Sequence, residues 1–163
     1  MEEFDTTTGE SVEALQKFTA WVEDFCTEAG IVSYKNSDEY ESILDLRHED
    51  ILGMSSDECF ANAIILMNYV GFLQKKLDMI QSQLNWCVEA LTYLSAKYWD
   101  RYDKYLPADV KRKSIIIENT YAQSIEKSRL RLCAGSQVLS ETCKDIKKRV
   151  SLFQDLGKTR NFK

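Results

Sequence analysis

The sequence predicts an all-α, oligomeric protein built on a long antiparallel helical hairpin, with an acidic helical segment ahead of it. Three observations predict this fold class. Apolar residues recur at alternating steps of four and three through residues 66–98, which is the a/d pattern of a helix that packs along its length. The 163 residues include only six glycines and one proline, so the chain has few places to turn. Pro107 follows the patterned stretch and suits the first turn of a second helix.

The first long helix is expected at about residues 57–105. It begins after Ser55, where Ser56, Asp57 and Glu58 place hydroxyl and carboxylate groups at the positive end of the helix dipole. The a/d positions are Leu66, Val70, Leu73, Leu77, Ile80, Leu84, Cys87, Leu91, Leu94 and Tyr98. We interpret this seam as core.

A second apolar stripe lies beside that seam, and one partner helix cannot cover both. An N-terminal helix has the length to cover about a third of it, and we expect the remainder to be buried between subunits. The stripe consists of Ile65, Tyr69, Phe72, Met79, Trp86, Ala90 and Tyr93.

The second long helix is expected at about residues 108–157, ending at Gly157. Gly135 lies in its middle, where a glycine costs about 1 kcal/mol relative to alanine, so we expect another backbone to pack closely there. The apolar positions of this helix are Ile117, Tyr121, Ile125, Leu132, Leu139, Ile146, Val150 and Phe153.

Residues 1–55 form a separate acidic segment in the predicted organisation, and residues 56–163 form the hairpin. Residues 1–10 have the composition of a disordered end. Ser11 is a candidate N-cap of a helix that ends at Gly30, and residues 36–38 are a candidate start for a short helix that ends at Leu46.

Charge divides the chain more sharply than its net value of −5 suggests. Residues 1–60 hold 16 acidic and 3 basic side chains, whereas residues 107–163 hold 6 acidic and 13 basic ones. This division favours a polyanionic partner, an internal charge match, or both.

Nothing in the sequence predicts an enzyme, a metal site or a cofactor. His48 is the only histidine and lies in a polar linker, so a His-dependent nucleophile has no oriented base. The five cysteines are scattered without a C-x-x-C pair, which is typical of buried thiols in a reducing cytoplasm. No apolar run approaches the ~20 residues of a membrane span, and the acidic N-terminus does not resemble a secretory signal.

The basic residues of the hairpin are the candidates for binding a nucleic acid, because cations spaced along a rod suit a phosphate backbone. Taken one at a time, each is more often part of a solvated helix face. The candidates are Lys97, Arg101, Lys111, Arg112, Lys113, Lys127, Arg129, Arg131, Lys147, Lys148, Arg149 and Arg160. Aromatic residues that can stack on unpaired bases lie nearby, namely Tyr98, Trp99, Tyr102, Tyr105 and Phe162.

The C-terminal pattern Ile146-Lys147-x-Arg149, followed after ten residues by Arg160-x-Phe162, resembles the end of the tailed-phage recombination mediator proteins of the UvsY type. The similarity covers about residues 55–163. It also includes Glu58 with Asn62 four residues on, an aromatic residue at Tyr69, and Tyr98 where the family's first long helix ends in a tyrosine pair.

The resemblance implies a non-enzymatic helical protein that assembles into a ring in the cytoplasm, or in the host cytoplasm if a phage encodes it. Such a protein binds single-stranded DNA and helps a recombinase displace the single-strand-binding protein. The resemblance also implies that the C-terminal helix takes part in ring assembly. The candidate assembly residues, from this helix and from the second stripe, are Phe72, Met79, Trp86, Tyr93, Ile146, Val150, Phe153 and Phe162.

Two features depart from the family. Its first long helix carries a late basic pair used for DNA, whereas the matching positions here are Thr92 and Leu94, with only Lys97 and Arg101 nearby. The acidic first 55 residues are an addition that can shield the basic helix by imitating DNA. Two rival functions stay open: a helical assembly or adaptor protein, such as a virion component, and an anti-defence inhibitor that binds a basic protein.

Overall fold

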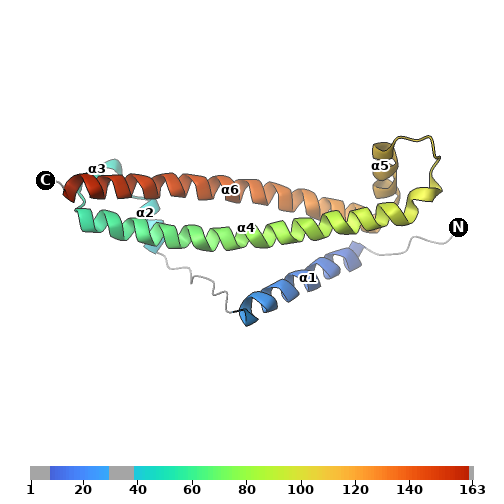
Figure 1. Ribbon diagram of the computed structural model, residues 1–163, viewed down its shortest axis with the longest axis horizontal. Helices are drawn as coiled ribbons and strands as arrows, with labels where there is room; N and C mark the ends of the chain where they lie inside the picture. The colour runs from blue at the N-terminus through green and yellow to red at the C-terminus, as the bar shows by residue number, and fades with distance from the viewer. Residues whose placement is uncertain (1–7, 30–38, 162–163) are drawn as a thin grey trace. The chain divides into compact units, whose positions relative to one another are not determined.

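The computed structural model describes residues 8–29 and 39–161, and every regular element within them is a helix. The two long helices, α4 (Ser56–Tyr98) and α6 (Thr120–Asn161), run antiparallel and pack together, which confirms the all-α hairpin (Figure 1). The shorter elements are α1 (Thr8–Glu28), α2 (Glu39–Leu44), α3 (His48–Gly53), the 3-10 turn η1 (Trp99–Arg101) and α5 (Ala108–Glu118). In the described part of the chain, no helix is long and apolar enough to cross a lipid bilayer.

The chain divides into two compact units. Unit 1 contains α1, the part of α4 from Met79 onward, η1, α5 and the part of α6 that ends at Ser136. Unit 2 contains α2, α3, the first part of α4 and α6 from Gln137 onward. The acidic segment is therefore shared between the units, with α1 in one and α2 and α3 in the other.

The a/d seam of α4 forms the core of unit 2, as predicted. α2, α3 and α4 pack there against α6, and Phe153 of α6 is completely buried. Burying an aliphatic or aromatic side chain of this size stabilises a fold by roughly 1.5–3 kcal/mol. The core side chains from the two long helices are Cys59, Ala63, Leu66, Val70, Leu73, Cys143, Ile146, Val150 and Phe153.

α2 covers the second stripe of α4 in unit 2. The ring of Tyr40 stacks on Tyr69 with a centroid separation of 3.7 Å, and Tyr69 in turn lies 6.1 Å from Phe72. Part of the stripe that we expected between subunits is therefore covered within one chain. Burial, followed by the hydrogen bond with Tyr40, raises the pKa of Tyr69 to about 12.

α1 covers part of the same stripe in unit 1, at Trp86. Its Phe18 ring lies 6.2 Å from Trp86 of α4, and Gln83 of α4 donates a 2.7 Å hydrogen bond from Nε2 to Oγ1 of Thr19. Beneath them, α4 and α6 bury Cys87, Leu94, Ala122 and Ile125. α1 begins at Thr8, so the expected cap Ser11 is a buried residue inside the helix. Residues 1–7 and 36–38, which also carried expectations, lie outside the described residues.

A reciprocal cap starts α4 where it was expected. The backbone N–H of Ser55 donates to Oε2 of Glu58 at 2.7 Å, and the backbone N–H of Glu58 donates to Oγ of Ser55 at 3.2 Å. The hydrogen bonds from Ser55 lower the pKa of the Glu58 carboxyl. This lowering means that the cap stabilises the fold above the unfolded pKa, and that its contribution is lost as the pH falls through the folded pKa.

The turn region differs from the two continuous helices that we expected. α4 ends at Tyr98 and tightens into η1, well before residue 105. The second helix is broken at Asn119, which has an extended backbone with φ −113° and ψ 110°. Its Oδ1 accepts a 3.0 Å hydrogen bond from the N–H of Ala122, so Asn119 ends α5 and caps α6. α5 consequently points away from the direction of α6 (Figure 1).

Two glycines of α6 have roles other than those we expected. No atom lies within 4 Å of a Cβ built on Gly135, so close packing does not explain that residue. A Cβ on Gly157 would lie 3.1 Å from the ring of Phe60, and α6 continues past this glycine to Asn161. Gly157 is therefore a close-approach position and not a helix stop.

Replacing the cap residue tests the break between α5 and α6. We expect Asn119→Ala to lower the free energy of unfolding by about 1 kcal/mol, because α6 loses its N-cap. Urea denaturation followed by circular dichroism measures the change. Asn119→Asp should retain most of the stability, and Asn85→Ala, at an exposed position within α4, should change it little. Equal losses for Asn119→Ala and Asn85→Ala would contradict the capping role.

The two glycines make a matched pair for a second test. Gly135→Ala should raise the free energy of unfolding by about 1 kcal/mol, since alanine is the better helix former. Gly157→Ala gains the same propensity but forces the Phe60 ring to move, at a cost of roughly 1–3 kcal/mol, so it should be the less stable variant. If the two variants are equally stabilised, Phe60 does not restrict position 157.

Candidate nucleic-acid interface

The basic–aromatic turn, which we define as residues 97–113, joins α4 to α5 within unit 1. It holds six basic and three acidic side chains together with four aromatic ones. Because η1 and α5 fold the chain back on itself here, these side chains come from three consecutive elements of one unit. The aromatic residues are Tyr98, Trp99, Tyr102 and Tyr105.

Cations lie over three of the four aromatic rings. Lys97 Nζ lies 5.4 Å and Arg101 Cζ 4.7 Å from the centre of the Tyr98 ring. Lys104 Nζ lies 4.9 Å from the centre of Tyr105. Separations below about 6 Å allow cation–π attraction, so this arrangement presents positive charge and ring surface together.

Tyr105 is the most accessible ring of the turn, at 82% exposure. Tyr102 is committed inside the chain, because its hydroxyl donates a 2.6 Å hydrogen bond to Oε2 of Glu118. Burial, followed by that hydrogen bond, raises the pKa of Tyr102 to about 12. Tyr105 is therefore the ring best placed to stack on an unpaired base, whereas Tyr102 holds α5 against the turn.

Lys111, Arg112 and Lys113 have different environments although they are consecutive. Lys111 is only 4% exposed, and its Nζ lies 5.1 Å from the centre of the Trp99 ring. Arg112 and Lys113 are exposed. Lys111 therefore fixes Trp99, while its two neighbours are open to solvent.

The basic residues of α6 in unit 1 are divided in the same way. Lys127 and Arg131 are exposed. Arg129 makes two 2.7 Å hydrogen bonds to the carboxylate of Glu126, one turn earlier. This bidentate pair uses the donors that a phosphate would need.

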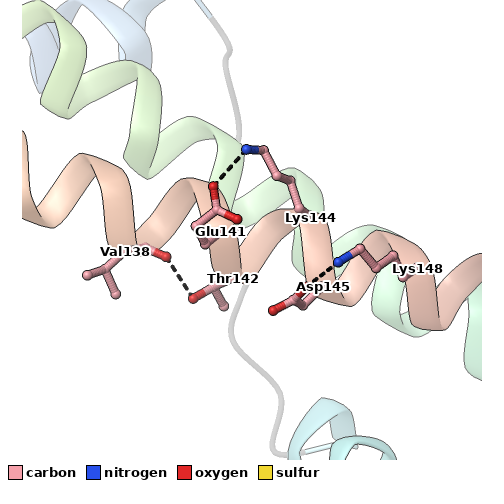
Figure 2. A network of polar contacts seen from close by, with 6 residues as sticks. All are labelled: Val138, Glu141, Thr142, Lys144, Asp145 and Lys148. Atoms are coloured by element: carbon pink, nitrogen blue, oxygen red, sulfur yellow. Dashed lines mark hydrogen bonds and ion pairs between the residues drawn. The ribbon is translucent and has the colours of Figure 1, made fainter.

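Ion pairs neutralise most of the exposed lysines of α6 in unit 2. Lys144 pairs with Glu141 at 2.7 Å and Lys148 pairs with Asp145 at 2.8 Å, and both pairs are drawn in Figure 2. In the same view, Thr142 donates to the carbonyl of Val138 at 2.9 Å. Exposed pairs of this kind add little stability, but each places a carboxylate beside the cation. Lys158 has Asp155 at 3.6 Å, and Lys147 is exposed with no ion pair to any described residue.

Arg149 and Arg160, the two arginines of the C-terminal pattern, bind backbone carbonyls within unit 2. Arg149 donates to the carbonyls of Ile43 and Leu44, in the last turn of α2. Arg160 donates to Leu52 at 2.9 Å and Ile51 at 3.2 Å, in the last turn of α3, and also to the carbonyl of Met54. Cations are favourable at these negative helix ends. Both arginines therefore hold the chain together at positions where we expected phosphate contacts.

The candidate assembly residues have different positions in the chain. Ile146, Val150 and Phe153 are buried in unit 2, which gives them an interior role in place of the subunit contact expected for them. Phe72, Met79 and Trp86 are half-buried. Tyr93 is 68% exposed and available to a partner, and Phe162 lies outside the described residues.

Of the predicted cations of the turn, Lys97 and Arg101 lie over the Tyr98 ring, Arg112 lines a groove together with Trp99, and Lys113 is exposed on α5. Sequence reasoning missed Lys104, which stacks over Tyr105. Its position beside an aromatic residue in the turn was the available signal. His48 is exposed at the start of α3. Among the described residues, no three or more His, Cys, Asp or Glu side chains are grouped to bind a metal ion.

The carbonyl contacts of Arg160 can be tested by a change that keeps its apolar stem. We expect Arg160→Met to lower the free energy of unfolding by roughly 1–3 kcal/mol, because charge-assisted hydrogen bonds to three carbonyls are lost. Lys158→Met is the matched control, since it removes one exposed ion pair. Urea denaturation should separate the two variants, and equal stabilities would show that the Arg160 contacts contribute nothing.

Comparison of the chain with protein-family models, with curated proteins and with solved structures found no match.

Proposed function

We propose that this protein binds single-stranded DNA without being an enzyme, and that it acts as a recombination mediator. The observation that carries the binding proposal is the basic–aromatic turn, where Lys97, Arg101 and Lys104 lie over aromatic rings. Phosphates attract the cations, and unpaired bases stack on accessible rings such as Tyr105.

The same geometry favours a single strand over a duplex. Stacking on a protein ring requires a base whose face is free, which duplex DNA does not offer within the helix. The chemistry of the turn needs no base-specific donor or acceptor, so we expect little sequence preference. The charge pairing along α6 in unit 2 makes that surface the weaker candidate.

The mediator role adds protein partners to this binding site. The resemblance of residues 55–163 to the phage mediators supports it, and implies a cytoplasmic protein that loads a recombinase in competition with the single-strand-binding protein. It also implies a homo-oligomeric ring. The exposed ring of Tyr93 is one surface on which a second copy can pack.

A helical assembly or adaptor protein that acts through protein–protein contacts alone is the second candidate function, either as a virion component or as an anti-defence protein. The exposed aromatic residues of α1 favour it: Trp21 is 63% and Phe25 is 55% exposed, with ring centroids 6.1 Å apart. Such a surface suits contact with another protein. This alternative predicts assembly that is insensitive to salt and no affinity for DNA.

Neutralising two lysines of the turn tests the DNA site. We expect Lys97→Gln/Lys104→Gln to bind labelled oligo-dT more weakly, with the log–log salt slope reduced by about 1.4 because each lost phosphate contact contributes about 0.7. Fluorescence anisotropy across a salt series measures both quantities in the full chain.

The matched control is Lys144→Gln/Lys158→Gln, which removes the same charge from paired lysines of unit 2. It should keep the slope of the natural chain. Equal effects of the two double variants would contradict a site at the turn, and no binding by the natural chain at low salt would favour the assembly function.

A further inference from the structure

A groove of about 750 Å³ opens in unit 1 beside the basic–aromatic turn. This volume lies within the range of small-molecule sites, roughly 300–1,000 Å³. Leu91 of α4 and Ile116 of α5 form part of its apolar lining, and Trp99 of η1 lines it with an aromatic ring. Ser95, Arg112 and the exposed carboxylate of Asp100 add polar groups to the same lining. The lining therefore offers apolar and aromatic surface together with charged groups of both signs.

The polar groups of this lining are not equally engaged. Arg129 is paired with Glu126, and the Thr92 hydroxyl donates to the carbonyl of Val88. Arg112 is exposed and forms no ion pair or hydrogen bond from its guanidinium to any described residue. Arg112 is thus the guanidinium of the groove that can bind an anion in a bidentate manner.

Ser95 supplies a second and independent observation. It is only 8% exposed and lines the groove. In the described part of the chain, its hydroxyl has no hydrogen-bond partner. Buried polar groups are normally hydrogen-bonded, so this hydroxyl is suited to a partner supplied by a ligand. Because Ser95 lines the groove, a ligand bound in the groove can supply that hydrogen-bond partner.

The aromatic wall is held in a fixed position. The buried Lys111 ammonium lies 5.1 Å from the centre of the Trp99 ring, an attraction that is stronger away from water. A ring that is fixed before binding loses little conformational freedom when a base stacks on it.

From these contacts we infer that the groove binds one nucleotide, with the base against Trp99 and the apolar lining, the base edge at Ser95, and the phosphate at Arg112. The nucleotide comes either from a bound single strand or from free mononucleotide. Binding of a nucleotide within a single strand rests on the proposed function, whereas binding of a free mononucleotide does not.

The test uses the fluorescence of Trp99 in the full chain carrying Trp21→Phe/Trp86→Phe, which leaves Trp99 as the single tryptophan. Titration with dAMP should quench the Trp99 fluorescence saturably.

Arg112→Gln should bind dAMP roughly tenfold more weakly, because a charge-assisted contact of about 1.4 kcal/mol is lost. Ser95→Ala should weaken dAMP but leave inorganic phosphate unaffected. Lys144→Gln should match the parent. Calorimetry of dAMP with the natural chain gives the same answer without the tryptophan changes.

Several results would overturn the inference: no dAMP binding, equal affinity for dAMP and inorganic phosphate, or an Arg112→Gln variant that matches the parent. Anisotropy of labelled oligo-dT on the same samples separates the two proposals. Oligonucleotide binding without dAMP binding removes the nucleotide groove and leaves the proposed function standing. Binding of dAMP without oligonucleotide binding would contradict the proposed function and leave the nucleotide groove standing.

Discussion

The structure depends above all on the burial of two adjoining apolar stripes of α4. A helix with one apolar stripe needs one partner, whereas α4 needs a partner on each of two faces. α6 covers the first stripe in both units. The second stripe is covered by α1 at Trp86 and by α2 at Tyr69. The acidic segment therefore contributes to packing: α2 and α3 add buried residues to the core of unit 2, and Leu15 of α1 packs against the core of unit 1. If the acidic segment did not pack on the hairpin, the rings of Trp86 and Tyr69 would be exposed to water.

Positive charge is engaged in different ways in the two units. Arg149 and Arg160 bind the carbonyl ends of α2 and α3, so the two arginines that carry the family resemblance serve packing in this chain. Lysines of α6 in unit 2 have carboxylates one turn away. In the turn, by contrast, Lys97 and Lys104 lie over tyrosine rings. A ring does not neutralise a cation, and for that reason the turn keeps the charge that a phosphate backbone requires.

Periodic patterns predicted most of the fold, and contacts distant in sequence explain what they missed. Each of the ten a/d residues of α4 is buried or half-buried, because the seam is a local pattern. The break at Asn119 depends on one side chain that caps a helix, in a stretch whose apolar spacing continues on both sides. Gly157 resembled a stop signal, yet its role depends on Phe60, nearly a hundred residues away. The candidate cations were identified from their charge alone. Composition does not predict whether each of them lies beside a carboxylate, a backbone carbonyl or an aromatic ring.

Photocrosslinking tests the central claim, that the basic–aromatic turn is the surface that binds single-stranded DNA. Oligo-dT carrying 4-thiothymidine would be irradiated with the natural full chain, and the adducts located by mass spectrometry. We expect adducts within residues 97–113. Tyr105 should carry the most, because it is the most exposed ring of the turn. Adducts confined to residues 141–160, or none at concentrations where the oligonucleotide is bound, would contradict it.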